Sequence, residues 1–534
     1  MSESGKKQTF LHGAALLAIA TAVVKVIGAL YKIPLKMVIG DAGYGYFMTA
    51  YNIYAVLLMI STAGLPVAMS RMVSQASSLG YYNQVRKVYR TARAIFLGLG
   101  VISSLLMVIF CHQLARFQRQ PDAWAAIAIL GPCALLMGII STYRGFFQGQ
   151  GNMRPTSVSQ VLEAVFKLLI GLAAAVVVMR LTNHVALAAG GAILGVTVSC
   201  LISAVYLKSC QSAAYGDLPQ SGEEALSFGA TAKELLKIAV PITIGSAGLQ
   251  LLTVLETNLY MGQLLTSNGL SQDTADHMKG IYDMSQTIFN MPCAFIIPIT
   301  VSIIPAVTGY LTLKDHGQVR ETEESAARIT GLIAMPCAVG LGILARPVMS
   351  LLGGYSGEKL ELAAQLMAIL SAGIFLYSVV QYTNALLQAH GYAHVPVVNM
   401  LLAGVVKLGA VYILAGNPVI GIRGAAIGAT GCYLCISVLN LISIRKLVAQ
   451  KPALLRNLLR AFVPAAVMGA AVFGAYHLLT GLLGADGSRL LLCGIPIGVG
   501  VAVYAVLVVV CKSITRQDCQ LLPKGDRIAA LLHL

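Results

Sequence analysis

Long apolar stretches recur along the whole chain and are separated by short polar segments. A helix needs about 20 mostly apolar residues to cross the hydrocarbon core of a bilayer, and it satisfies its own backbone hydrogen bonds there. The pattern therefore predicts an all-α polytopic membrane protein with about fourteen transmembrane helices. The expected spans are residues 10–31, 46–70, 94–112, 123–148, 158–179, 185–207, 236–262, 281–309, 326–352, 361–388, 395–415, 421–444, 458–480 and 489–511.

Composition supports a lipid environment. Hydrophobic residues make up 57% of the chain and charged residues 11%, whereas a soluble domain carries about 25% charged residues. The net charge of +16 does not favour nucleic-acid binding, because no basic segment outside the spans is long enough to form a binding module. If the N-terminus is cytoplasmic, the cytoplasmic loops hold about twice as many Lys and Arg as the outer loops. We therefore expect both termini in the cytoplasm.

The two halves of the chain resemble each other. The segment from Gln148 to Lys167 aligns without a gap on the segment from Gln388 to Lys407. Parallel repeats of this kind are related by an axis along the membrane normal. We predict an N-lobe of six helices (residues 1–210), a cytoplasmic linker (211–233), a C-lobe of six helices (234–450), and two further helices with a cytoplasmic tail (451–534). The two lobes are expected to be related by a pseudo-two-fold axis.

Charged residues inside spans are costly, and each one suggests a function. Lys25, Lys32 and Lys36 recur at spacings of seven and four, so they share one face of the first span. Lys32 and Lys36 either face a cavity or extend to the outer headgroups. Lys25 lies deeper, and we expect it to face a water-filled cavity.

The predicted spans 158–179 and 395–415 match in the repeat, but only the first has an acid four residues before its lysine. Glu163 precedes Lys167 by four residues, an order that favours an ion pair. That pair either holds helices together or contacts the substrate. Lys407 aligns with Lys167, but Ala403 stands where an acid would be, which favours a cavity role for Lys407.

The remaining candidates are an arginine, a buried acid and a set of helix breakers. Arg144 either extends to the cytoplasmic headgroups or belongs to the site. Glu256 is expected to titrate, bind a cation, or pair with Lys25. Gly64, Pro66 and Pro298 interrupt spans at matching positions and are predicted hinges. Arg71 follows Pro66 at the expected cytoplasmic mouth.

The summed charge of these candidates is positive, and cations in a low-dielectric cavity suit a phosphate or diphosphate. The sequence contains no nucleotide-binding glycine loop and no pattern typical of a metal cluster. We therefore predict neither catalytic residues nor metal ligands, and no enzymatic activity. The predicted substrate-binding residues are Lys25, Lys32, Arg71, Arg144, Glu163, Lys167, Glu256 and Lys407.

Two motifs resemble a known group. The run from Ser61 to Arg71 and the run from Gly145 to Thr156, followed by Ser159, Gln160 and Glu163, are similar to signatures of the stage V sporulation protein B group. That group is in the polysaccharide-transporter branch of the MATE-like multidrug/oligosaccharidyl-lipid/polysaccharide exporter superfamily, which includes lipid II flippases of the MurJ type. Lys25-Val26-Ile27-Gly28 resembles the Arg-x-x-Gly pattern of those flippases, with Lys in place of Arg.

The resemblance implies a transporter of the bacterial cytoplasmic membrane. It would move an undecaprenyl-diphosphate-linked saccharide, above all the peptidoglycan precursor lipid II, from the cytoplasmic to the outer leaflet by alternating access, in cell-wall synthesis or sporulation. We expect a monomer among membrane lipids that needs no cofactor and is driven by membrane potential, Na⁺ or H⁺. The alternatives are a flippase for a capsule, teichoic-acid or O-unit precursor, a drug or cation antiporter of the same superfamily, a polyprenyl-linked glycosyltransferase, and a non-transporting scaffold.

Overall fold

The computed structural model describes residues 3–62, 64–216, 218–296, 303–304, 307–311, 313–449, 452–484, 488–511 and 513–514. Within these ranges, side chains are not described for residues 3–19, 22, 25, 26, 29, 61, 62, 241, 242, 244–246, 249 and 483. Every regular element in the described ranges is a helix. The predicted all-α membrane fold is therefore confirmed.

The chain divides into two compact units, which are described separately. Unit 1 comprises residues 1–265 and 270–280, and unit 2 comprises residues 266–269 and 281–534. The helices of unit 1 are α1 (Glu3–Thr62), α2 (Leu65–Ser78), α3 (Tyr82–Ile109), α4 (Cys111–Phe117), η1 (Pro121–Ala123), α5 (Trp124–Gly149), α6 (Arg154–Thr182), α7 (Val185–Gly216) and α8 (Phe228–Thr266).

Helix α9 (Gln272–Cys293) begins in unit 1 and ends in unit 2. The other helices of unit 2 are α11 (His316–Ile343), α12 (Ala345–Leu352), α13 (Gly357–Ala389), α14 (His394–Gly416), α15 (Arg423–Leu447), α16 (Leu454–Leu458), η2 (Leu459–Ala461), α17 (Phe462–Leu483) and α18 (Arg489–Val510). The boundary between units thus lies near residues 265–281, whereas the linker predicted from the sequence is residues 211–233. Helix α8 belongs to unit 1.

In the described part of the chain, eleven helical segments are long and apolar enough to cross a membrane. One of them, residues 30–78, contains the end of the first predicted span and the whole of the second. These two spans are joined in α1, which has a non-helical residue at Gly40 (φ 71°, ψ −174°) where the chain kinks. The total of about fourteen spans remains a prediction.

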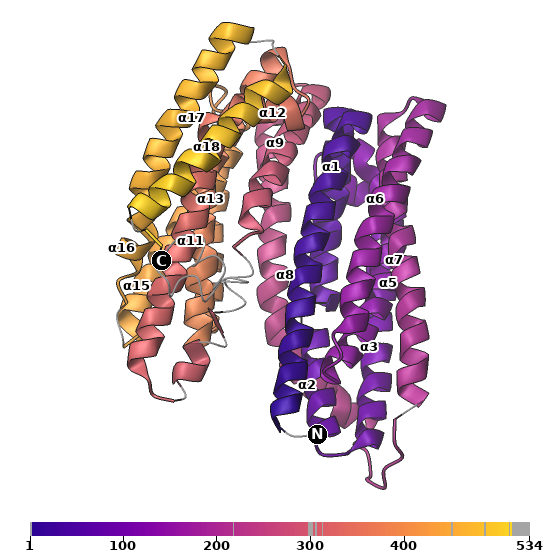
Figure 1. Ribbon diagram of the computed structural model, residues 1–534. Coiled ribbons are helices and arrows are strands. Elements are labelled where there is room, and N and C mark those ends of the chain that lie inside the picture. The colour runs from indigo at the N-terminus through magenta and orange to yellow at the C-terminus, as the bar shows by residue number, and fades with distance from the viewer. Residues whose placement is uncertain are drawn as a thin grey trace. The chain divides into compact units, whose positions relative to one another are not determined.

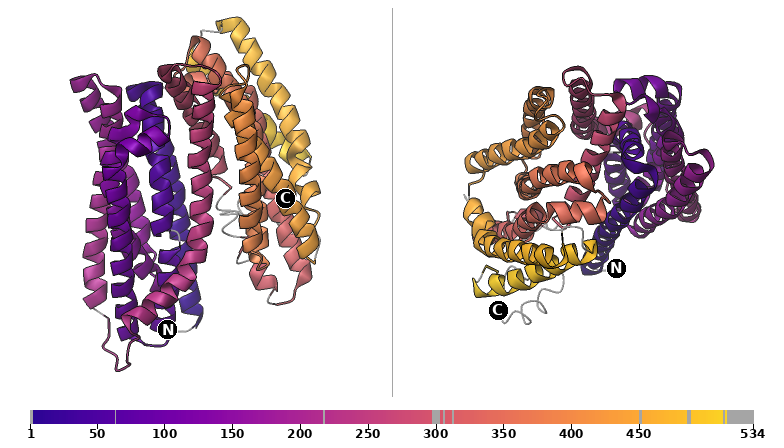
Figure 2. Two further views of the ribbon diagram at one scale, coloured as in Figure 1. Left: turned by 180° about the vertical axis from the view of Figure 1, so that it is seen from behind. Right: turned by 90° about the horizontal axis from the view of Figure 1, so that it is seen from above.

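Close packing of helices shapes unit 1. Helix α6 packs along α7, α5 packs against α3 and α7, and α1 packs against α6, so these helices run side by side (Figures 1 and 2). Gly195 of α7 meets the backbone of Gly171 in α6, and a Cβ atom at Gly195 would overlap that backbone. Small residues at such crossings let helices approach closely in a bilayer, where packing is a main source of helix association.

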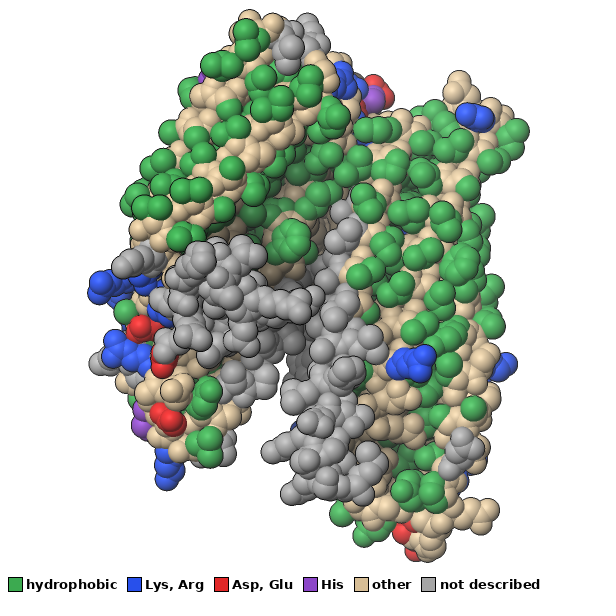
Figure 3. Space-filling model, in the orientation of Figure 1, with side chains coloured by type: hydrophobic (Ala, Val, Ile, Leu, Met, Phe, Trp, Pro, Cys, Tyr) green, Lys and Arg blue, Asp and Glu red, His purple; other side chains and the backbone are tan. Residues whose placement is uncertain are grey.

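Unit 2 is built around α13, which packs against α11 and α15, while α14 packs on α15 and α17 packs on α18 and α11. The outward faces of α17 and α18 are strongly apolar. Leu478 is 64% exposed, Leu482 is 74% exposed and Val510 is 70% exposed, and hydrophobic side chains cover these two helices in Figure 3. Such a surface is suited to contact with lipid chains.

The repeat predicted around residues 148 and 388 is visible in the backbone of each unit. Gln150 ends α5 with φ −83° and ψ −1°, and His390 ends α13 with φ −81° and ψ 4°. In both places the next residue is a glycine with positive φ, 77° at Gly151 and 84° at Gly391. The two segments therefore end their helices in the same way, as aligned repeats should.

Gly195→Ala tests the close crossing of α6 and α7. We expect the added methyl group to lower stability by about 1–3 kcal/mol, because the backbone of Gly171 blocks it. Thermal unfolding in detergent measures this change. Gly98→Ala is the matched control, since its Cβ would meet no atom within 4 Å and alanine is favoured in a helix by up to about 1 kcal/mol. Equal melting temperatures of the two variants would contradict the packing argument.

Candidate functional site

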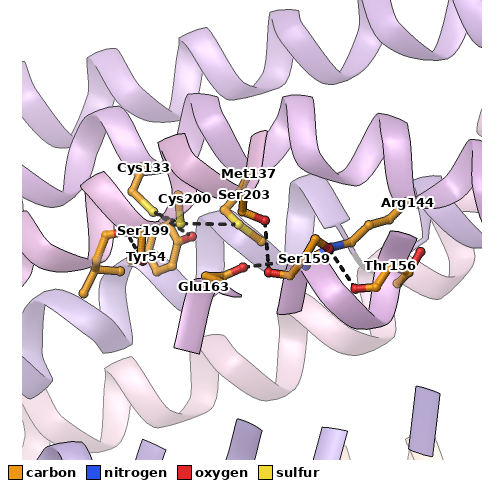
Figure 4. Close-up of polar contacts among 11 residues, drawn as sticks. Tyr54, Cys133, Met137, Arg144, Thr156, Ser159, Glu163, Ser199, Cys200 and Ser203 are labelled. Atoms are coloured by element: carbon orange, nitrogen blue, oxygen red, sulfur yellow. Dashed lines mark hydrogen bonds and ion pairs between the residues drawn. The ribbon is translucent and has the colours of Figure 1, made fainter. Parts of the chain in front are cut away.

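An ion pair between α5 and α6 lies inside unit 1 (Figure 4). The Nη2 group of Arg144 donates to Oε2 of Glu163 at 3.1 Å, and its Nε group donates to Oγ of Ser159 at 3.1 Å. The two charged side chains are only 13% and 23% exposed. Arg144 therefore does not extend to the headgroups. The recorded partner of Glu163 is Arg144 and not Lys167, the partner predicted from spacing.

Helix α7 adds further polar contacts to this ion pair, and we call the whole set the polar seam. The hydroxyl of Ser203 donates to the backbone oxygen of Ser159 at 3.2 Å. Further along, Sγ of Cys133 and Sγ of Cys200 lie 3.2 Å apart, and the Tyr54 hydroxyl lies 3.4 Å from Cys133 Sγ (Figure 4). Because the one cation in this seam is matched by one anion, the seam is electrically neutral and is well suited to fixing the positions of α5, α6 and α7.

Unit 2 carries neutral residues at the equivalent positions. The offset of 240 residues that separates Gln148 from Gln388 also relates Arg144 to Asn384, Ser159 to Asn399, Glu163 to Ala403 and Ser203 to Ser443. Asn384, Asn399 and Ser443 belong to an amide network around Asn440. Its Nδ2 donates to Asn384 Oδ1 at 2.8 Å, and its Oδ1 accepts from Asn399 Nδ2 at 2.9 Å. The same place in the repeat therefore holds an ion pair in one unit and amides in the other.

A second polar cluster surrounds the kink in α1. Lys36 Nζ lies 3.1 Å from Asp41 Oδ1, and the two side chains are 8% and 7% exposed. The second oxygen of Asp41 lies 3.6 Å from Nδ1 of His277 in α9. Gly40 supplies the positive φ of the kink, and Gly280 has no Cβ to collide with the backbone of Asp41. Lys36 is therefore buried and paired, so the alternative that it extends to the headgroups is wrong.

Asp276 is the most deeply buried carboxylate of this cluster, at 1% exposure. It accepts hydrogen bonds from the Tyr46 hydroxyl at 3.0 Å, Gln120 Nε2 at 3.0 Å and Gln272 Nε2 at 2.9 Å. Burial raises the pKa of Asp276, and these hydrogen bonds together with the Lys279 charge oppose that rise only in part. The start of α9 is thereby tied to α1 and to the segment before η1.

The other predicted cations are spread over several helices. Lys32 on α1 is half-buried, Arg71 on α2 is exposed, and Lys167 on α6 is half-buried with no ion pair recorded within the described ranges. The side chain of Lys25 lies outside the described residues. Lys407 on α14 is half-buried and makes contacts of its own, so the missing acid at its i−4 position is not by itself a reason for a cavity role.

Glu256 is buried in α8 at 3% exposure. Its expected pairing with Lys25 stays a prediction, because the Lys25 side chain is not described. Gly64, a predicted hinge, lies between α1 and α2, and a Cβ there would collide with the backbone oxygen of Ala239 in α8. Close helix packing therefore requires glycine at this position. Pro66 lies in the first turn of α2, and Pro298 lies outside the described residues.

Sequence reasoning missed two buried carboxylates, Asp276 of α9 at 1% exposure and Glu323 of α11 at 0% exposure. Both precede the predicted spans, and neither belongs to a repeat motif. The signal that was available is composition: polar residues such as Gln118, Gln120, Gln272 and Asp276 flank apolar spans in two separate loops. Only the fold brings those two loops together.

Comparison with known proteins places the chain in a family. A family model described as "Polysaccharide biosynthesis protein" matches residues 10–310, which is more than half of the chain. The chain belongs to this polysaccharide biosynthesis family. It is 27% identical to stage V sporulation protein B of Bacillus subtilis, over 82% of this chain and 84% of the relative.

Two further relatives are also from Bacillus subtilis. The chain is 24% identical to the lipid II flippase MurJ, over 74% of this chain and 76% of the relative. It is 25% identical to the uncharacterized membrane protein YabM, over 99% and 97% of the two chains. Stage V sporulation protein B and MurJ are the relatives that the sequence motifs predicted.

Solved structures share the fold. The lipid II flippase MurJ in an inward closed conformation matches with a TM-score of 0.66 at 13% identity, covering 93% of this chain and 98% of that one. An inward-facing multidrug resistance MATE family transporter of the MOP superfamily matches with a TM-score of 0.61 at 15% identity, covering 82% and 95%. The chain therefore has the fold of this transporter superfamily.

Glu163→Ala tests whether the ion pair supports unit 1. We expect a loss of about 1–3 kcal/mol, because the half-buried Arg144 guanidinium loses its anionic partner. Adding Arg144→Asn should recover part of this loss, since Asn and Ala stand at the equivalent positions of unit 2. Thermal unfolding of the single and double variants measures the coupling. Strictly additive losses would show that the two side chains do not act as a pair.

The raised pKa of Asp276 predicts a pH dependence of stability. The folded protein holds this proton more tightly than the unfolded chain, so the stabilisation from the protonated form is lost as pH rises above the ordinary Asp value of about 3.9. Melting temperatures of Asp276→Asn at mildly acidic pH should therefore vary less with pH than those of the parent. Asp273→Asn, whose side chain is 84% exposed, should keep the parental profile, and a parental profile in Asp276→Asn would contradict the assignment.

Proposed function

We propose that this chain is a flippase that moves an undecaprenyl-diphosphate-linked saccharide from the cytoplasmic to the outer leaflet by alternating access, with lipid II as the preferred substrate. The observation that carries the proposal is the relationship to the lipid II flippase MurJ of Bacillus subtilis over 74% of the chain. Membership of the polysaccharide biosynthesis family and the fold of the transporter superfamily support it.

The charges within unit 1 fit a diphosphate headgroup. A diphosphate carries several negative charges, and Lys side chains bind it as point charges while Arg side chains bind it through paired N–H groups. In our proposal Lys25, Arg71 and Lys167 of unit 1 attract the headgroup, as does Lys407 of unit 2. Arg144 is already paired with an acid, so its role is to position α5 and α6.

The lipid chain needs an apolar path, and α17 and α18 offer one. Their outward side chains are apolar and exposed, and Leu490 and Val501 are each 67% exposed. A polyprenyl chain that lies along these helices would stay in a hydrocarbon environment while its headgroup crosses.

The sequence favours a phosphate-bearing substrate over a cationic drug. An antiporter for cations needs buried acids that are free to bind them. Within the described residues, Glu163 is paired with Arg144 and Asp41 with Lys36. Among the predicted substrate-binding residues outside the Arg144–Glu163 pair, five are Lys or Arg and one, Glu256, is an acid. In our proposal this positive balance suits a flippase for lipid II or for another diphosphate-linked saccharide.

Complementation tests the cargo. Cells depleted of their essential lipid II flippase would express this chain, and the measured quantity is lipid II accessible in the outer leaflet. We expect accessible lipid II and growth to recover. Confirmed membrane insertion without recovery would contradict the lipid II assignment, and recovery of a capsule or teichoic-acid precursor defect instead would identify another cargo.

Lys25→Ala tests the cationic headgroup site in the same assay. Removing a charge that meets a phosphate should reduce transport about tenfold or more, because a charge-assisted hydrogen bond contributes about 1.5–3 kcal/mol. Lys233→Ala, which removes an exposed lysine of α8, is the matched control and should transport as the parent does. Equal transport by Lys25→Ala and Lys233→Ala would rule out the role of Lys25.

A further inference from the structure

Unit 2 contains a buried acid–imidazole pair that the substrate site does not use. Oε1 of Glu323 on α11 lies 2.6 Å from Nε2 of His390 at the end of α13, and the side chains are 0% and 7% exposed. The Tyr382 hydroxyl donates to the backbone oxygen of Glu323 at 2.7 Å. Ionisable groups buried in membrane proteins are costly and mark ion pathways or proton relays.

The Glu323–His390 pair has zero net charge only when it holds one proton more than an ionised carboxylate beside a neutral imidazole. A neutral imidazole beside the ionised Glu323 leaves one negative charge in a low-dielectric interior, whereas proton uptake gives an imidazolium–carboxylate pair of zero net charge. The second oxygen of Glu323, Oε2, accepts no hydrogen bond from the described residues. The pair thus has a strong electrostatic reason to bind one proton.

Two neighbouring charged residues, Glu324 and Arg328, have other partners. Glu324 accepts from Arg320 Nε at 2.9 Å and from the backbone N–H of Ala453 at 3.1 Å. Arg328 donates to Asn457 Oδ1 at 3.2 Å. The elements packed around the pair also carry Tyr310, His316, Arg320, Glu321, Tyr382, Tyr392, His394, Arg445, Lys446, Arg456 and Arg460.

The helix end does not need a titratable side chain at this position. Gln150 is the aligned residue of unit 1, and it ends α5 with the same backbone conformation and the same following glycine. A neutral amide therefore suffices for the fold. Histidine is the side chain that changes charge near physiological pH, so its presence opposite a buried carboxylate points to proton binding.

The other polar cluster of unit 2 is less suited to a coupling ion. The amide network around Asn440 consists of neutral side chains whose donors and acceptors already meet one another. A bound Na⁺ there would find carbonyl oxygens and no carboxylate, and a buried cation without a counter-charge is costly. Of the two clusters, the acid–imidazole pair is the one that a cation, in the form of H⁺, would neutralise.

We propose that Glu323 and His390 form a proton-binding site that couples transport to proton uptake. The proton comes from water at the predicted cytoplasmic end of α11 and α13 and is held by the imidazole, while Glu323 stays ionised. Loss of the proton leaves a buried negative charge and weakens the contact between α11 and α13. This inference rests on the proposed transport function for its coupling role but not for proton binding itself.

Infrared difference spectroscopy of the purified full chain tests proton binding without transport. The chain has nine histidines, so the measured quantity is the parental difference spectrum between pH 8 and pH 6 minus the same spectrum of each variant. This subtraction should leave an imidazolium signal and a shifted carboxylate signal for both Glu323→Gln and His390→Gln. Glu358→Gln and His394→Gln are matched controls at exposed positions, and they should keep the signals of the pair. Signals that persist in the spectra of both Glu323→Gln and His390→Gln, so that the subtraction leaves nothing, would overturn the site.

Transport in proteoliposomes at clamped voltage tests the coupling. An imposed pH gradient should change the parental rate by up to about tenfold per pH unit, the limit for one proton. Glu323→Gln and His390→Gln should lose this dependence, and His394→Gln should keep it. Retained pH dependence in the first two variants, or dependence on a Na⁺ gradient alone, would overturn the coupling. A parent that transports no lipid-linked saccharide would contradict the proposed function, while the infrared result would still decide proton binding.

Discussion

The hydrocarbon interior of the membrane offers no water to solvate a polar group, and this constraint governs the structure. Backbone groups must be satisfied within each span, which only helices can do here. Charged side chains must meet a partner or face water. Three pairs of described residues follow that rule: Arg144 of α5 meets Glu163 of α6, Lys36 meets Asp41 across the kink of α1, and His390 meets Glu323. Each pair therefore helps to fix helices as well as to neutralise charge.

The two repeats meet this constraint in different ways. At the same aligned positions unit 1 has an arginine, a serine and a glutamate, whereas unit 2 has two asparagines and an alanine. In unit 2 the charged pair lies instead at the α13 end, where unit 1 has Gln150. In our proposal three of the four cations that attract the substrate headgroup belong to unit 1, and proton binding belongs to unit 2.

Hydropathy and the repeat were sufficient to predict the helical membrane fold, because both depend on local sequence. The superfamily followed from the motifs around Pro66 and Gly149. The partners of individual charges did not follow: Glu163 was expected to meet Lys167, four residues away on its own helix, yet it meets Arg144 from α5. Spacing finds partners along one helix, whereas pairs between helices depend on which faces pack together. For the same reason, the partners of Asp276, which include Tyr46 and Gln120 from distant segments, could not be identified from the sequence.

Translocation by the purified chain is the most direct test of the central claim. Lipid II would be placed in the inner leaflet of proteoliposomes, and an enzyme added outside would modify only molecules that reach the outer leaflet. Our account predicts that modification proceeds well beyond the level of protein-free vesicles and requires the diphosphate-linked saccharide. Modification no faster than in protein-free vesicles, with correctly inserted protein, would contradict it.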